Sequence, residues 1–303
     1  YTHWFLGQLG QNWSDACAEN LEKHGHILEV PQQTDFYVQK VRPSENRIFV
    51  IVSDAFRYEV AASLAEALQR EIQCKVTLGS CEGLFPTVTK YGMAALLPHK
   101  KLEVKARPDG TLAVLADGEP TDAGYRDKLL KKATPASVAL KYEDILLLKR
   151  QERQALVKGM SVVYIYHDTV DKASHTSDSA VFSACDEAIS QIKNLARIII
   201  NDFGGTNILV TADHGFLYTY SALGEDDKVD RTTPNEQDVE IDRRYLITQE
   251  GARPKYLLPV QLLDGNTGYE AFAPREYVRI KKKGGGLNFV HGGISLQEMV
   301  VPV

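Results

Sequence analysis

The sequence has few cysteines and no long apolar run. Its four cysteines among 303 residues show no Cys-x-x-Cys spacing, so neither a disulfide framework nor a cysteine zinc site is expected. This pattern favours a reducing compartment, and the cytoplasm is the default. No stretch approaches the roughly 20 consecutive apolar residues that cross a bilayer, and we therefore predict no membrane partner.

Positive charge is not in excess either. The formal net charge is -5, so a polyanion would have to be met by local positive charge or by metal ions. The chain begins with Tyr1 and lacks the charged head and cleavage site of a signal peptide, which suggests a domain cut from a longer protein. With 44% apolar and 25% charged residues, the composition predicts one large α/β domain or two small ones.

Apolar runs and amphipathic stretches alternate along the chain. Residues 47–53, 160–166 and 207–212 are rich in β-branched side chains and predict strands buried on both faces of a parallel sheet. Helical spacing follows the first run and fills residues 182–203. The alternation predicts an α/β fold with a mostly parallel central sheet.

The sequence also predicts elements outside the central sheet. Residues 1–45 are expected to be a helical lead-in, the tail of an upstream region, with a helix over residues 12–21 that stops at Gly25. A strand is expected at residues 74–78, a hairpin turn at Asp109-Gly110 and a charged helix over residues 140–158. Residues 46–303 would form the core, with insertions at about 99–160 and 222–285, and the second insertion is expected to be an irregular lid or binding loop.

Polar side chains stand where the predicted strands end. In a parallel sheet ligands collect outside the carboxyl ends of the strands, so carboxylates and imidazoles there are candidates for chemistry. An alternative for Asp213 and His214 is that the aspartate caps the next helix and the histidine lies on the surface. His167 and Asp168 are expected to support the site or to be an alternative pair. The candidate ligands are Asp54, Asp171, His175, Asp213, His214 and His291.

A mixture of carboxylate and imidazole suits zinc, or manganese where oxygen ligands dominate. Two ions roughly 3.5 to 4 Å apart are the usual arrangement for phosphoryl chemistry. Thr89 follows Pro86 at the predicted start of a helix, where backbone N–H groups favour an anion. A helix cap is the alternative role for Thr89.

The order of these residues resembles the alkaline phosphatase superfamily. The resemblance implies that Asp54, Asp213 and His214 share one metal and that Asp171, His175 and His291 bind the other. Sulfatases of this superfamily have Ala-Ala-Leu-Leu five residues after the nucleophile, and Thr89 precedes Ala94-Ala-Leu-Leu97 by the same interval, which favours Thr89 over Thr87. Pro98-His99 replaces the usual Thr-Gly, so the end of this helix is left open.

Longer motifs resemble the PglZ proteins of BREX phage-defence systems. They are Val-Ser-Asp54-Ala-Phe-Arg-Tyr-Glu59, Phe-Pro-Thr-Val-Thr89-Lys-Tyr-Gly-Met, Tyr-His-Asp-Thr-Val-Asp171 and Thr-Ala-Asp213-His-Gly-Phe. The resemblance implies an alkaline-phosphatase-like three-layer sandwich, with helices on both faces of the sheet. It also implies a metal-dependent phosphodiesterase with nuclease activity that works with other BREX proteins.

The expected mechanism uses Thr89 as nucleophile at a site of two divalent ions. Lys90, Lys172 or Arg57 would assist in binding the substrate, with a purely surface role as the alternative. Two other functions stay open: a scaffold that mainly docks other BREX proteins, and a phosphomonoesterase or sulfatase-like hydrolase of small molecules.

Overall fold

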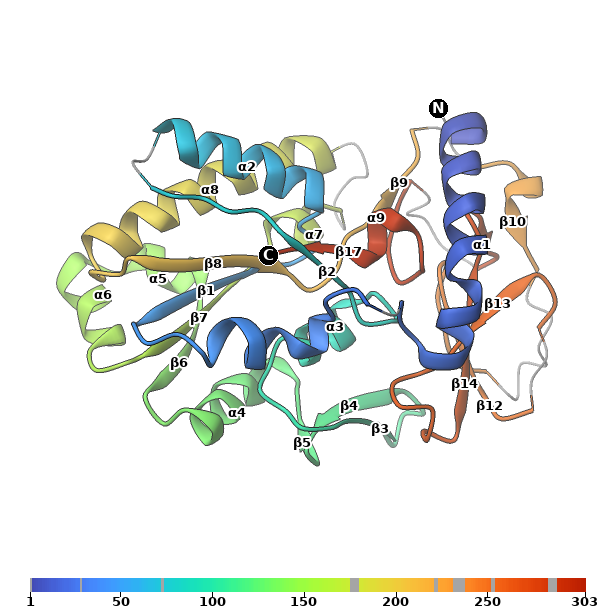
Figure 1. Cartoon of the computed structure of the whole chain (residues 1–303), viewed down its shortest axis with the longest axis horizontal. Coiled ribbons are helices and arrows are strands. Elements are labelled where there is room, and N and C mark those ends of the chain that lie inside the picture. The colour runs from blue at the N-terminus through green and yellow to red at the C-terminus, as the bar shows by residue number, and fades with distance from the viewer. Residues whose placement is uncertain are drawn as a thin grey trace.

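A four-stranded parallel sheet forms the centre of the fold (Figure 1). The computed structural model describes residues 2–27, 29–71, 74–174, 180–220, 223–230, 238–251, 254–282 and 288–303. From edge to edge the strands are β6 (Ser137–Lys141), β7 (Val162–His167), β1 (Ile48–Ser53) and β8 (Asn207–Ala212), and every pairing is parallel. The carboxyl ends of β7, β1 and β8 therefore meet at one edge.

Helices cover both faces of this sheet, as predicted. Successive side chains of β1 point to opposite faces: Phe49 and Ile51 join the core with α2 and α8, whereas Val50 and Val52 join the core with α3 and α4. The first layer contains α2 (Tyr58–Glu71), α5 (Tyr142–Leu147), α6 (Arg150–Val157) and α8 (Val181–Asn201). The second contains α3 (Thr89–Ala95), α4 (Arg126–Ala133) after the short η4 (Ala123–Tyr125), and the strands β3 (Leu102–Ala106), β4 (Leu112–Ala116) and β5 (Glu119–Pro120).

The lead-in is helical and packs on the core. After η1 (Thr2–Leu6), α1 (Gly7–His24) ends at Gly25, whose φ of 72° and bond to the Leu21 carbonyl cap the helix as predicted. Trp13 Nε1 donates to the Ile294 carbonyl at 2.7 Å, and Cys17 and Leu21 lie in the same core cluster as β1. Two short turns, η2 (Gln33–Asp35) and η3 (Tyr37–Val41), lead to β1. The domain boundary near residue 45 stays a prediction.

The region after Phe216 is not irregular, and that expectation was wrong. It contains an antiparallel sheet of order β11-β12-β14-β13, beside α1 in Figure 1. Its strands are only two to six residues long and are separated by turns rich in glycine and proline, so the sequence showed no clear strand pattern. The elements are β9 (Leu217–Tyr218), η6 (Glu225–Asp227), β10 (Lys228–Val229), β11 (Asp238–Ile241), β12 (Leu246–Gln249), β13 (Leu257–Val260), β14 (Tyr269–Pro274), β15 (Arg279–Ile280) and β16 (Phe289–Val290).

Two further expectations were wrong. Residues 74–79 carry no regular structure and are mostly exposed, because β-branched composition forms a strand only where a neighbour completes the ladder. Residues 140–158 do not form one helix. Their first residues belong to β6, and extended backbone at Leu148 and Lys149 separates α5 from α6. The hairpin at Asp109-Gly110, between β3 and β4, is confirmed.

The chain closes beside the central sheet. Between β7 and α8 lies α7 (Thr169–Ser174), and the last elements are α9 (Leu296–Met299) and β17 (Val300–Pro302). The final strand was predicted, and it pairs antiparallel with β2 (Ser80–Glu82). Within the described residues, no helix is long and apolar enough to cross a membrane.

A buried ion pair joins the second sheet to this final segment. Arg244 Nη2 lies 2.9 Å from Glu298 Oε2, and both side chains are 0% exposed. Glu298 also accepts hydrogen bonds from the backbone N–H groups of Gly293 and Ser295. Burial alone would raise the pKa of Glu298, but Arg244 and these bonds outweigh burial and lower it. The pair therefore fixes the turn that follows His291.

We expect Glu298→Gln to lower the free energy of unfolding by about 3 kcal/mol or more, because it leaves the buried Arg244 charge without its carboxylate and with only carbonyl acceptors. Replacing both residues, as Arg244→Met with Glu298→Leu, should cost less. Urea titration measures this, with the exposed Lys23→Gln as control. Because folding lowers the pKa of Glu298, its contribution is fully present above the ordinary pKa of 4.5 and declines as the pH falls below it. An equal effect of the single and double changes would contradict this account.

Candidate metal and catalytic site

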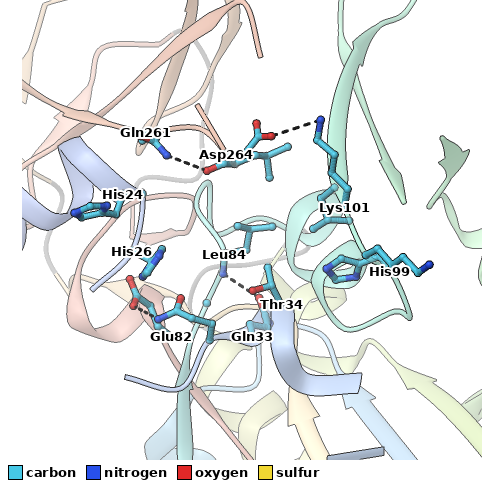
Figure 2. A pocket seen from close by; sticks show the side chains of 16 residues that line it. His24, His26, Gln33, Thr34, Glu82, Leu84, His99, Lys101, Gln261 and Asp264 are labelled. Atoms are coloured by element: carbon cyan, nitrogen blue, oxygen red, sulfur yellow. Dashed lines mark hydrogen bonds and ion pairs between the residues drawn. The ribbon is translucent and has the colours of Figure 1, made fainter. Parts of the chain in front are cut away.

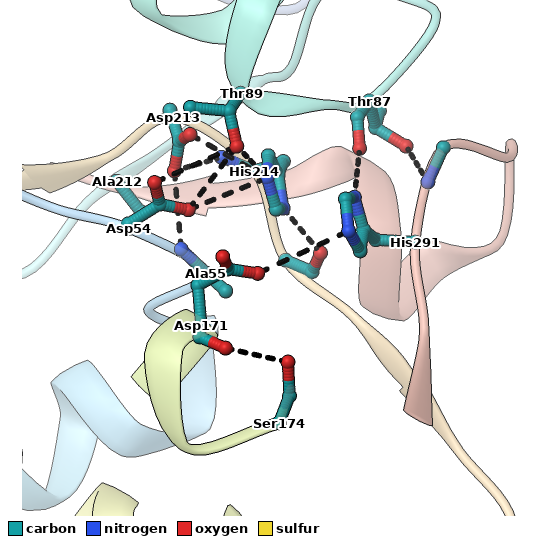
Figure 3. Close-up of polar contacts among 12 residues, drawn as sticks. Asp54, Ala55, Thr87, Thr89, Asp171, Ser174, Ala212, Asp213, His214 and His291 are labelled. Carbon is teal, nitrogen blue, oxygen red and sulfur yellow. Dashed lines mark hydrogen bonds and ion pairs between the residues drawn. The ribbon is translucent and has the colours of Figure 1, made fainter. Parts of the chain in front are cut away.

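The carboxyl ends of β1 and β8 bring Asp54, Asp213 and His214 together (Figure 3). Each offers one ligand atom, and these atoms all lie within 4.8 Å of one another. Among the described residues, this is the group of three or more ligand-type side chains that could hold a metal ion. Asp213 and His214 are fully buried and Asp54 is 8% exposed. Sequence reasoning thus placed these three residues at one point.

The backbone after β1 turns sharply, and this turn directs an N–H group to Asp213. Ala55 has a left-handed φ of 56°, a conformation that is uncommon without a glycine, and its N–H donates to Asp213 Oδ1 at 3.1 Å. The His214 N–H donates to the same oxygen at 2.9 Å. Asp213 Oδ2 is buried without a hydrogen-bond partner in the described part of the chain. A divalent cation beside this oxygen would offset the cost of burying it without a donor.

His214 presents one nitrogen to this cluster. Its Nδ1 lies 2.9 Å from the Gly215 carbonyl, so Nδ1 carries a proton and Nε2 is the nitrogen that faces the two carboxylates. Nε2 lies 3.5 Å from Asp54 Oδ1 and 3.4 Å from Asp213 Oδ2. An imidazole oriented through its other nitrogen by a carbonyl is the usual form of a metal ligand.

Thr89, the first residue of α3, faces the cluster. Its hydroxyl lies 3.4 and 3.5 Å from the two Asp54 oxygens and 3.3 Å from His214 Nε2. The hydroxyl of Thr87 points elsewhere: it donates to the Gly293 carbonyl at 2.7 Å and accepts from the Gly292 N–H. Only Thr89, of these two threonines, therefore has its hydroxyl at the cluster.

Asp171 and His291 lie next to these residues. His291 Nε2 is 4.0 Å from Asp171 Oδ1, and the His291 ring stacks on His214 with centroids 4.3 Å apart. The carbonyl of Thr87 lies 3.3 Å from His291 Nδ1. The structure thus brings both residues to the edge of the first cluster, while His175 lies outside the described residues.

Electrostatics make the site unfavourable without a cation. Burial raises the pKa of Asp54 well above its ordinary value, and the charges of Asp213 and Asp171 raise it further. The charge of Arg126 has a smaller effect and lowers this pKa. Burial and the neighbouring His214 lower the pKa of His291 to about 4. Neutral imidazole is the form that binds metal, and divalent cations would offset the repulsion between carboxylates. The donor set therefore fits a metal.

The basic residues suggested from sequence have different surroundings. Lys90 donates to the Leu112 carbonyl and to Glu240 Oε1, which ties α3 to β4 and to the second sheet. Arg57 pairs with Glu59 and lies over the Phe216 ring, 4.9 Å from its centroid. Lys172 is exposed on α7, next to Asp171. Arg57 and Lys172 therefore lie close in sequence to Asp54 and Asp171, and their role in substrate binding stays a prediction.

Three supporting residues were missed or only partly anticipated. Gln33 is 1% exposed, and its Nε2 donates to the carbonyls of Ala212 at 3.0 Å and Asp213 at 2.7 Å. No sequence pattern marks this loop glutamine. Arg126, on α4, lies over the Tyr166 ring at 4.7 Å and has no ion-pair partner among the described residues.

His167 was expected to support the site, and it is buried beneath it. Its Nδ1 lies 2.9 Å from Ser53 Oγ, and its Nε2 lies 2.6 Å from Gln191 Oε1. Its carbonyl accepts the Asp54 N–H at 2.7 Å. The neighbouring Asp168 is exposed. His167 therefore joins the ends of β1 and β7 rather than forming a pair with Asp168.

A separate polar pocket of about 420 Å³ lies beside the turn that precedes Thr89 (Figure 2). Gln33 lines this pocket and also donates a hydrogen bond to the Asp213 carbonyl, so one side chain contacts both the pocket and the segment that carries the metal cluster. No metal-binding group is formed there within the described ranges. The titratable residues that line the pocket include His24, His26, Glu82, His99 and Lys101.

Comparisons with known proteins identify similar sequences. The family model described as "BREX system PglZ alkaline phosphatase-like domain" matches residues 36–303. The chain is 36% identical to the alkaline phosphatase-like protein BrxZ of Escherichia coli and 33% identical to the alkaline phosphatase-like protein PglZ of Bacillus cereus, over 100% of its length. It spans 36% of the length of each of these relatives.

We expect Asp213→Asn to lower the affinity for zinc about ten-fold or more, because it removes the charge of a carboxylate whose second oxygen has no hydrogen-bond partner within the described ranges. Elemental analysis after dialysis against limiting zinc measures the bound metal. Asp168→Asn is the matched control, since it removes a neighbouring exposed carboxylate. Equal metal content in both variants would exclude Asp213 as a ligand.

Proposed function

The chain belongs to the PglZ family of BREX alkaline phosphatase-like domains, and we propose that it is the catalytic core of a metal-dependent phosphodiesterase with nuclease activity in this phage-defence system. The single observation that carries the proposal is the Thr89 hydroxyl, 3.3 Å from His214 Nε2 and 3.4 Å from Asp54 Oδ1. With a metal bound to these three buried residues, the hydroxyl would be a nucleophile beside a Lewis acid. In a scaffold the same groups would be a destabilising cluster.

Asp54, Asp213 and His214 would hold one divalent ion, and Asp171 and His291 would hold a second. His175 remains a proposed ligand of the second ion. Zinc suits this mixture of nitrogen and oxygen donors, with manganese as the alternative. The ions would supply positive charge that neutralises the phosphate and lowers the pKa of the hydroxyl.

The residues of the chain have separate parts in the reaction. Thr89 Oγ1 would form a bond to phosphorus while the bond to one ester oxygen breaks, and the released alcohol takes up a proton. Asp54, the carboxylate nearest to the Thr89 hydroxyl, is placed to accept the threonine proton. Water would then attack the phosphorylated threonine, releasing a phosphomonoester and restoring the hydroxyl.

Basic side chains around the cluster would bind the remaining phosphate oxygens. Arg126 lies on α4 over the Tyr166 ring without an ion-pair partner in the described part of the chain, and its charge acts on Asp54. A planar guanidinium of this kind suits phosphate oxygens. Arg57 and Lys172 are the other candidates, whereas Lys90 is engaged with Glu240 at 2.5 Å. We propose other BREX proteins as partners of the full-length protein.

We expect Thr89→Ala to lose about a thousand-fold or more in kcat towards bis-(p-nitrophenyl) phosphate while it keeps its metal, because it removes the nucleophile alone. Thr89→Ser should keep part of the activity. Thr87→Ser, which retains the hydroxyl that bonds to Gly293, is the matched control. Release of p-nitrophenolate with zinc or manganese present measures each variant.

The same assay separates the alternatives. Faster hydrolysis of p-nitrophenyl phosphate than of the diester would favour a phosphomonoesterase, and the mono-sulfate tests a sulfatase. Cleavage of plasmid DNA would support the nuclease. A metal-loaded wild-type protein that turns over none of these substrates would contradict the hydrolase and favour a docking scaffold.

A further inference from the structure

Three aromatic side chains gather at the surface on one side of the site. Phe182, at the start of α8, meets Tyr218 edge to face at 4.8 Å between centroids and stacks on Tyr220 at 5.6 Å, with ring planes 11° apart. Tyr218 and Tyr220 are 5.4 Å apart. Phe182 is 43% exposed and Tyr220 is 71% exposed. We call these three residues the aromatic platform.

A row of rings connects the platform with the metal cluster. The short strands β9 and β16 are antiparallel, with Tyr218 opposite Phe289. Side chains two residues apart point to the same face of a strand, so Phe216, Tyr218, Phe289 and His291 share one face. Phe216 packs on Phe289 at 4.5 Å, and Phe289 lies 6.0 Å from His291.

Within this row, the exposed fraction of the rings rises from Phe216 and Phe289 to Tyr220. Phe216 and Phe289 are 1% and 7% exposed, whereas Tyr220 is 71% exposed. The buried end of the row packs against His291 at the site, and the outer end presents aromatic faces to solvent. The platform therefore lies at the outer end of a packed row of rings that begins at His291.

We propose that the aromatic platform stacks an unpaired nucleobase of the substrate, so that the site prefers single-stranded nucleic acid or an unpaired end over an intact duplex. This inference rests on the proposed phosphodiesterase function. Proteins hold single strands by stacking bases on aromatic side chains, which tolerates any base because every base has a π-face. Within a duplex both faces of a base are covered by its neighbours, so the platform would have no face to contact.

Two features favour a nucleobase over a protein partner. Three rings cover far less than the roughly 800 Å² that each partner buries in a stable protein interface. The platform also continues a row that starts at the proposed catalytic residues, whereas a docking surface has no reason to do so. The net charge of -5 leaves non-specific attraction to the phosphate backbone weak, so stacking would supply much of the binding.

Two small diesters test the inference. Thymidine 5′-(p-nitrophenyl phosphate) and methyl p-nitrophenyl phosphate share the leaving group and differ in the nucleoside. We expect Tyr220→Ala to lower the ratio of kcat/KM for the thymidine ester over the methyl ester by about 5-fold or more. Phe182→Ala should do the same, and Tyr220→Phe should restore the ratio. Tyr256→Ala, which removes an equally large tyrosine that is 77% exposed, should leave the ratio as in wild type.

The outcomes separate the inference from the function it rests on. An equal loss for both esters would indicate a merely structural platform and overturn the inference, as would a wild-type ratio in Tyr220→Ala. If the metal-loaded wild type hydrolyses neither ester, the proposed function fails. Binding of a fluorescein-labelled oligothymidine and of a blunt hairpin to Thr89→Ala then tests the platform alone. Tighter binding of the single strand that Tyr220→Ala weakens about 5-fold supports stacking, and equal binding overturns it.

Discussion

The repulsion between buried carboxylates at one edge of the sheet is the constraint on which the site depends. Asp54 and Asp213 follow neighbouring parallel strands, so the register that aligns β1 with β8 forces their side chains together. Burial and this like charge raise the pKa of Asp54, and one Asp213 oxygen has no donor among the residues that the structure describes. A divalent cation would offset both penalties. In the proposed function the same cation would also activate the hydroxyl of Thr89.

The rest of the structure holds this unfavourable arrangement in place. Gln33 binds the carbonyls at the end of β8, and His167 joins the ends of β1 and β7. The buried pair of Arg244 and Glu298 fixes the turn after His291. These contacts come from the lead-in, the central sheet and the second sheet. Residues far apart in the sequence therefore position the side chains of the site together. Close packing contributes as well, since a Cβ on Gly92 would lie 2.1 Å from the Asp213 carbonyl oxygen.

Much of the central fold could be predicted because its signals are local. The strands β1, β7 and β8 are apolar runs of six residues, and Gly25 marks the end of α1. The second sheet could not be predicted in this way, since its strands are short, interrupted by glycine and proline, and stabilised by neighbours distant in sequence. For the same reason residues 74–78 have the composition of a strand but pair with no strand among the described residues. The end of β6 lies in a stretch whose sequence predicts a helix.

The sequence by itself determined the chemistry at the strand ends: which carboxylates and imidazoles are present, and that parallel strands would bring Asp54 near Asp213. The tertiary structure decided how each group points. It directs the hydroxyl of Thr89 to the cluster and that of Thr87 to Gly293, engages Lys90 with Glu240, and brings Arg126 in from α4. The reason is physical, because residue type and strand order follow from local patterns, whereas side-chain direction depends on packing between segments that only the folded chain brings together.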